Sequence, residues 1–106
     1  MLNKKVFAVI NTRGCHWDDS KPMEDQGDWR AHADFMNGLL AEGFVLLGGP
    51  LAGTRDVLLI VRARDEAEIE ARLDNDIWIV KGLLRRRQIN PWWLRLGSLD
   101  ALDASP

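Results

Sequence analysis

The sequence holds one cysteine, no tyrosine and four prolines among its 106 residues. The single cysteine, Cys15, excludes an internal disulfide and any metal site built from several cysteines. No apolar run approaches the roughly 20 residues of a membrane-spanning helix. The apolar run Val6–Ile10 is also shorter than the core of a signal peptide, which needs about 7–15 residues. We therefore expect a protein of the cytoplasm with no membrane segment.

An excess of charge of one sign is also missing. The chain has 14 Lys and Arg against 16 Asp and Glu, a formal net charge of −2 at pH 7. A surface built to bind nucleic acid is not expected at this balance. The hydrophobic fraction of 46% and the charged fraction of 28% are typical of a globular domain. We expect one domain over residues 1–98, with a modest core, and a short acidic tail over residues 99–106.

Hydrophobic patterning predicts four strands and two main helices. Apolar residues at helical spacing predict one helix over Asp28–Gly43 and a second over Asp65–Asp74. Asp76–Gly82 is expected to add one further helical turn. The stretches rich in apolar and β-branched residues, expected as strands, are Lys4–Thr12, Phe44–Leu51, Asp56–Arg64 and Leu83–Asn90.

Local signals mark the ends of these elements. Asp28 and Asp65 are expected to cap the two helices with their side chains, and Gly43 is expected to end the first helix. Arg13–Gly27, which contains Gly, Pro, Asp and Ser without periodicity, is expected to be a long loop. In the last strand, alternation sends Arg86 to one side of the sheet and its two arginine neighbours to the other. Ion pairs or protection of a sheet edge are the expected roles of this basic run, rather than RNA binding.

The order β-α-β-β-α-β is that of the ferredoxin-like fold. We therefore expect an α+β protein with a four-stranded antiparallel sheet and two main helices on one face. If the second face of such a sheet is apolar, it must be covered, and a second copy of the chain is the simplest cover. A homodimer formed through the sheet face is the expected assembly. Trp92 and Trp93, which follow the last strand, favour an interface there.

Several motifs, taken in order, resemble the YciI-like (YCII-related) family. The resemblance runs from about residue 6 to residue 96, nearly the whole chain. The ordered series is more specific than any one of its members. It consists of Trp29–Met36 (WRAHADFM), Gly43, Gly48–Leu51 (GGPL), Asp76–Trp78 (DIW), Gly82–Leu83 and Ile89–Trp92 (INPW).

The resemblance implies the fold of the dimeric α/β barrel superfamily, in agreement with the order of elements. It also implies a His–Asp pair in a cleft near the dimer interface, at positions that are here His32 and Asp76. One type of relative resembles a dehydrochlorinase that acts on a chlorinated hydroxyhydroquinone. The chain departs from the family at Ile77, which stands where the family usually has a proline.

His32 and Asp76 suit acid–base chemistry. An imidazole serves as general acid or base near neutral pH, and a carboxylate can orient its ring. The alternative for His32, which lies on an apolar helix stripe, is a buried ring with a satisfied hydrogen bond. The alternative for Asp76 is an N-cap of the helical turn that follows it. We expect these two roles of Asp76 to compete, because a carboxylate oxygen bonded to a backbone N–H is a weaker base for histidine.

Five further residues are candidates for substrate binding. Arg13, at the loop end of the first strand, could hold an anionic or phenolate oxygen, or could be a surface arginine. Trp29 and Trp78 could line an aromatic pocket, or could pack in the core and the dimer interface. Gly49 and Pro50 could form one wall of the cleft, or only a tight exit from the second strand.

Two other groups of residues are weaker candidates for a functional site. Cys15 and His16 are the residue types of a nucleophile and its base, but adjacent residues usually point in different directions. The histidines and loop aspartates have no spacing typical of metal ligands. We expect neither a metal nor a cofactor.

The leading hypothesis is a cofactor-free lyase or isomerase that acts on a small cyclic or aromatic organic substrate. His32 would move the proton, Asp76 would orient His32, and Arg13 or backbone N–H groups would steady an oxyanion. The alternative is a module without chemistry, which binds a small ligand in the same cleft or serves only for dimerisation.

Overall fold

The computed structural model describes residues 4–99 of the chain. Within these residues, the order of strands and helices is the one that the sequence predicts. The elements are β1 (Lys5–Arg13), α1 (Trp29–Ala41), β2 (Val45–Pro50), β3 (Asp56–Ala63), α2 (Glu66–Leu73), α3 (Ile77–Val80) and β4 (Leu84–Pro91), with a short 3-10 helix (Met23–Asp25) before α1. The predicted tail over residues 99–106 lies, beyond Leu99, outside the described residues.

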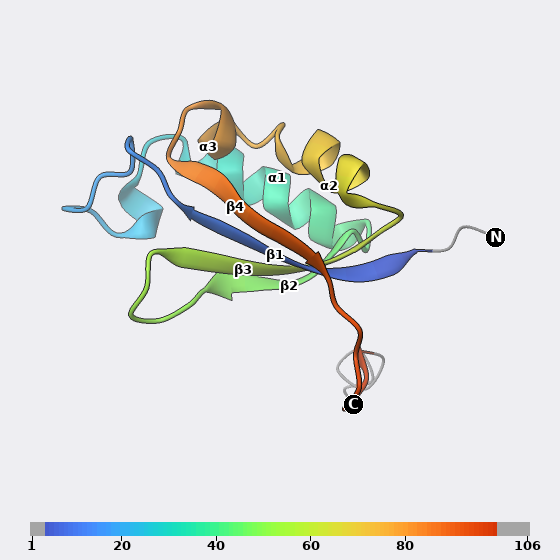
Figure 1. Ribbon diagram of the computed structural model, residues 1–106. Helices are drawn as coiled ribbons and strands as arrows, with labels where there is room; N and C mark the ends of the chain where they lie inside the picture. The colour runs from blue at the N-terminus through green and yellow to red at the C-terminus, as the bar shows by residue number, and fades with distance from the viewer. Residues whose placement is uncertain (1–3, 100–106) are drawn as a thin grey trace, which may run out of the picture.

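The four strands form one antiparallel sheet in the order β2-β3-β1-β4. This is the strand order of the ferredoxin-like fold, so the predicted α+β class is confirmed. Within residues 4–99, the helices α1, α2 and α3 cover one face of the sheet, and none of them lies on the other face (Figure 1). The apolar run Val57–Val61 lies in β3, which is flanked by strands on both sides, as its composition predicts.

Side-chain capping follows the prediction at one helix and not at the other. Asp65 accepts a hydrogen bond from the backbone N–H of Glu68 at 2.9 Å, so it caps α2. The prediction that Asp28 caps α1 is wrong. Asp28 has a left-handed backbone, with φ 61°, and its side chain makes no cap hydrogen bond. A capping side chain needs an extended backbone to reach the helix N–H groups, and Asp28 does not have one. Its carboxylate lies 2.8 Å from Nζ of Lys81 instead.

The core is divided between two clusters on the helix side of the sheet. The larger one packs α1 and α2 on the strands, and Val9, Val61 and Ile69 in it have no exposed surface. The smaller one lies under α3, at the end of β1 and the start of β4. It consists of the buried residues Trp17, Trp78, Leu83 and Leu84.

The long segment after β1 is more ordered than the predicted loop. The buried Gln26 holds it together, because its amide accepts from the N–H of Asp18 at 3.0 Å and donates to the carbonyl of the same residue at 2.7 Å. The hydroxyl of Ser20 donates to the Asp18 carboxylate at 2.6 Å. This bond, with one from the Ser20 backbone N–H, holds the pKa of Asp18 below its ordinary value. These hydrogen bonds fix the conformation of the segment beside the sheet.

The pairing of β1 with β4 is irregular at one point. The register shifts between Ile10 and Asn11, where β4 carries one extra residue, so Asn11 faces Arg86. Arg86 then reaches Asp74 at 3.0 Å, and Arg87 reaches Asp56 at 2.7 Å. The ion pairs expected for the arginine run are thus present for these two residues, which pair with different elements.

The helix-free face of the sheet is apolar at β2 and β3. Leu47 is 45% exposed there, and the segment that follows β4 leaves from the same side (Figure 1). Leu47, Leu58, Ile60, Trp92, Leu94 and Leu96 line a groove between this segment and the sheet. Among the described residues, no helix has the length and apolar character needed to cross a membrane.

Candidate active site

The side chains of His32 and Asp76 meet between α1 and α3. His32 is the fourth residue of α1, and Asp76 directly precedes α3. Nδ1 of His32 lies 2.8 Å from Oδ2 and 3.0 Å from Oδ1 of Asp76. The two side chains are 13% and 3% exposed, so the pair is shielded from bulk water while one edge of the ring stays accessible.

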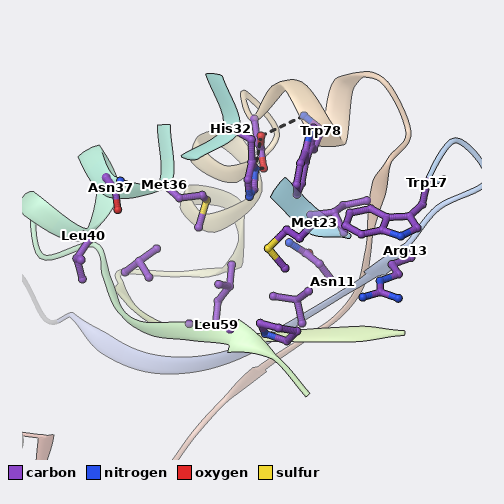
Figure 2. A pocket seen from close by; sticks show the side chains of 17 residues that line it. Asn11, Arg13, Trp17, Met23, His32, Met36, Asn37, Leu40, Leu59 and Trp78 are labelled. Carbon is purple, nitrogen blue, oxygen red and sulfur yellow. Dashed lines mark hydrogen bonds and ion pairs between the residues drawn. The ribbon is translucent and has the colours of Figure 1, made fainter. Parts of the chain in front are cut away.

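This contact decides which nitrogen of the neutral imidazole carries the proton. A carboxylate oxygen only accepts hydrogen bonds, so Nδ1 of His32 must donate to Asp76. Nε2 is then left with its lone pair, and the ring extends from α1 toward the pocket (Figure 2). The contact holds the imidazole in one tautomer and one orientation, which is what a general base requires.

Asp76 also caps α3. Its Oδ1 accepts the backbone N–H of Trp78 at 3.0 Å, while Oδ2 makes the shorter bond to His32. The carboxylate makes both contacts at once, because its two oxygens offer about four lone pairs. The cap fixes the carboxylate in place for the histidine, and the replacement of the usual proline by Ile77 does not prevent it.

An aromatic wall supports the imidazole. The indole of Trp78 stacks on the ring of His32, with 3.8 Å between ring centroids and 9° between planes. The indole N–H of Trp78 donates to the carbonyl of Gly27 at 2.7 Å, and Trp17 packs edge-on against it at 5.3 Å. Trp29 lies 5.8 Å from Trp78 and is not among the residues that line the pocket. Trp29 therefore packs beside Trp78 and His32 without lining the pocket.

The pocket beside His32 has a volume of about 210 Å³. It lies between α1, the loop after β1 and the helix-side face of the sheet (Figure 2). Except for Trp29, all the residues that the sequence suggests for the site line it: His32, Asp76, Arg13, Gly49, Pro50 and Trp78.

Arg13 contributes a cation at the floor of this pocket. Its guanidinium lies over the ring of Trp17, 4.7 Å from the centroid. No acidic side chain within residues 4–99 forms an ion pair with it, which leaves its N–H donors for another anion.

Asn11 and Met23 also line the pocket, and neither belongs to a motif named above. A signal for Asn11 exists in the sequence. It is a polar residue in an apolar strand, two positions before Arg13, and strand alternation places these two side chains on one face. Met23 carries no such signal, because its place depends on how the long loop folds back over the sheet.

Cys15 and His16 lie outside the pocket. The Cys15 sulfur is 3.9 Å from Nδ1 of His16, but that nitrogen is 2.9 Å from the carbonyl oxygen of Lys81. Since a carbonyl only accepts, Nδ1 carries a proton and cannot take one from the thiol. In the described part of the chain, no group of three or more His, Cys, Asp or Glu side chains is arranged to hold a metal ion.

Fold and pocket together define a class of protein. It is a ferredoxin-like α+β domain in which a His–Asp pair faces an aromatic pocket on the helix side of the sheet. The family model of the YCII-related domain matches residues 9–93, and the chain therefore belongs to the YCII-related family. This confirms the resemblance noted from the motifs. A search of curated proteins found no match, and a search of solved structures found none either.

Proposed function

We propose that this protein is a cofactor-free lyase or isomerase that moves a proton within a small cyclic or aromatic organic substrate. The observation that carries the proposal is the 2.8 Å contact between His32 and Asp76, which points the free nitrogen of the imidazole at a pocket. His32 acts as general base and then as general acid, and Asp76 holds it in the required tautomer.

The composition of the pocket supports this chemistry. A volume of about 210 Å³ suits a single small ring, and Met23, Met36 and Leu59 supply apolar lining for it. Removal of a proton from carbon leaves negative charge on the substrate, and Arg13 offers a cation for that charge. The stacked indole of Trp78 keeps water from one face of the imidazole.

Proton transfer can be tested before the natural substrate is known. Wild-type protein is incubated in D₂O with a panel of small cyclic ketones, phenols and chlorinated hydroxyhydroquinones, and loss of C–H signals is followed by ¹H NMR. We expect exchange or turnover of at least one compound, and its loss in His32→Gln. His16→Gln is the matched control, because His16 lies outside the pocket.

Two results would contradict the proposal. Turnover that survives His32→Gln would assign the chemistry to another group. Binding of panel compounds without exchange or conversion would favour the alternative, a module that binds a small ligand without chemistry.

We also propose that two copies of the chain pack through the helix-free face of the sheet. Leu47 at 45% and Trp92 at 43% exposure leave apolar area in water there. The same face of a second copy is apolar at the same positions, so a two-fold dimer buries the two faces against each other.

Light scattering at micromolar concentration tests this assembly. We expect twice the chain mass of 12.0 kDa for the wild type and a single chain mass for Leu47→Arg. Val80→Arg is the control, since Val80 is exposed on α3, on the helix side. A wild-type monomer would refute the dimer, and a Leu47→Arg dimer would place the interface elsewhere.

A further inference from the structure

Asn11 is a buried amide in the floor of the pocket. It lies in β1 and is 4% exposed, and its strand neighbours on the same face are Val9 and Arg13. An amide buried among apolar residues is costly unless it is hydrogen-bonded. Because Asn11 lies between the apolar Val9 and the cationic Arg13, its amide needs a specific polar partner.

Arg86 is that partner on one side. Its Nε lies 2.7 Å from Oδ1 of Asn11. A guanidinium has only donors, so the amide oxygen must face Arg86 and the amide nitrogen must face away from it. Within residues 4–99 this nitrogen has no hydrogen-bond partner, yet it is not sealed off from solvent. Because Asn11 lines the pocket, its two N–H donors open into that space, below His32 (Figure 2).

The fold holds Arg86 for this contact. The extra residue in β4 sets Arg86 directly opposite Asn11, and its Nη1 is bound by Asp74 at 3.0 Å at the end of α2. Its Nη2 is buried without a partner, the only such side-chain atom in the described part of the chain. With Nε on Asn11 and Nη1 on Asp74, the guanidinium is held in one orientation, which keeps the Asn11 amide in its own.

We propose that the Asn11 amide holds the oxygen of the substrate whose carbon loses a proton to His32, and that Arg86 is its positioning residue. This inference rests on the proposed function and adds the substrate class. The substrate is a carbonyl compound with an acidic C–H bond beside the carbonyl, a class that includes the keto tautomer of a phenol.

The electron balance is that of enolisation. The C–H bond breaks, Nε2 of His32 gains the proton, and the electron pair moves to the oxygen, which becomes an enolate or phenolate. The N–H of Asn11 donates to this oxygen, and the cation of Arg13, two residues along the same strand face, adds to its stabilisation. The C=O bond then re-forms, and the enolate pair either takes the imidazolium proton onto another carbon or forms a new C=C bond. In the second case a group leaves with the electron pair of its own bond to carbon and accepts the proton.

A phenolate probe tests the oxygen site without any turnover. 4-Nitrophenol is suitable, because its phenol and phenolate forms absorb at different wavelengths. We expect wild-type protein to bind the phenolate and shift the equilibrium toward it. In Asn11→Asp the second oxygen of the carboxylate faces the pocket while the pairing with Arg86 is kept. Phenolate affinity should then fall by roughly 10- to 100-fold, the value of a hydrogen bond to a charged group.

Matched variants separate this role from folding. Asn75→Asp makes the same chemical change at an exposed asparagine that donates to the carbonyl of Ala71, and should leave probe binding unchanged. Arg86→Met should weaken phenolate binding, and Arg86→Lys, which keeps a donor, should restore part of it. If Arg86→Met does not fold, Asn11→Asp and Asn11→Leu decide the matter.

The outcomes distinguish this inference from the proposed function. Unchanged phenolate binding in Asn11→Asp, or no spectral shift with the wild type, would overturn the role of Asn11. Phenolate binding that depends on Asn11, without any hydrogen exchange in D₂O, would contradict the reaction and leave the oxygen site standing.

Discussion

Replacing Asp76 by Asn changes the tautomer of His32 while leaving most of the fold in place. Asparagine caps a helix about as well as aspartate. Its single oxygen should therefore still accept the backbone N–H of Trp78, which lies 3.0 Å from Oδ1 of Asp76 in the wild type. The amide nitrogen then faces Nδ1 of His32, where the carboxylate Oδ2 accepts at 2.8 Å. Two donors cannot share this position, so the proton of the imidazole moves to Nε2.

The expected loss of stability is modest and the loss of activity is large. A hydrogen bond to a charged group gives way to a neutral one, which costs about 1–2 kcal/mol for a pair as buried as this. A domain with a free energy of unfolding of roughly 5–15 kcal/mol remains folded. In serine-protease triads the same inversion lowers kcat by about 10⁴-fold, and we expect a loss of that order here.

Nitrogen NMR of the imidazoles reads the tautomer directly. The chain has two histidines, and His16 also donates from Nδ1, to the carbonyl of Lys81, so it is an internal reference that should not change. Urea unfolding gives the stability and hydrogen exchange in D₂O gives the activity. The reasoning is refuted if His32 of Asp76→Asn keeps its proton on Nδ1, or if exchange falls less than about tenfold.

Three further predictions concern a carboxylate of α2, a glycine after β1 and the cation of the pocket. Glu68→Gln should lower stability at pH 7, because the N–H of Arg64 holds the pKa of Glu68 below its ordinary 4.5; the difference should disappear in acid unfolding curves as pH falls through that lowered pKa. Gly14→Ala should cost about 1–3 kcal/mol in urea unfolding, because its Cβ would lie 2.3 Å from the carbonyl oxygen of Gly82. Arg13→Gln should weaken binding of 4-nitrophenolate by more than that of 4-nitrotoluene in equilibrium titrations, and equal losses would assign Arg13 only a packing role.

Much of the fold follows from patterns within short stretches of chain. The apolar stripe of α1, the cap at Asp65 and the continuous apolar run of β3 all involve residues a few positions apart. Each of these predictions is confirmed, because hydrogen bonds and side-chain periodicity inside one element depend little on the rest of the molecule. The failure at Asp28 has the opposite cause, since its carboxylate pairs with Lys81, which is 53 positions away.

The site was predictable only in part. The residue types and motif order pointed to His32 and Asp76, and they lie in contact across 44 positions of sequence. The tautomer of His32, the cap made by Asp76 and the stacked indole of Trp78 needed the relative placement of α1 and α3. The same holds for the role of Asn11, which depends on its hydrogen bond with Arg86, 75 positions away.

By itself, the sequence determined the order of the elements, the α+β class and the family, because each is written in local periodicity and in motifs along the chain. Only the tertiary structure decided which donors and acceptors face one another. The extra residue of β4 sets Arg86 against Asn11, and the docking of α3 beside α1 turns one imidazole nitrogen toward Asp76 and the other toward the pocket. Such contacts form only when the sheet and its helices close, so no local pattern records them.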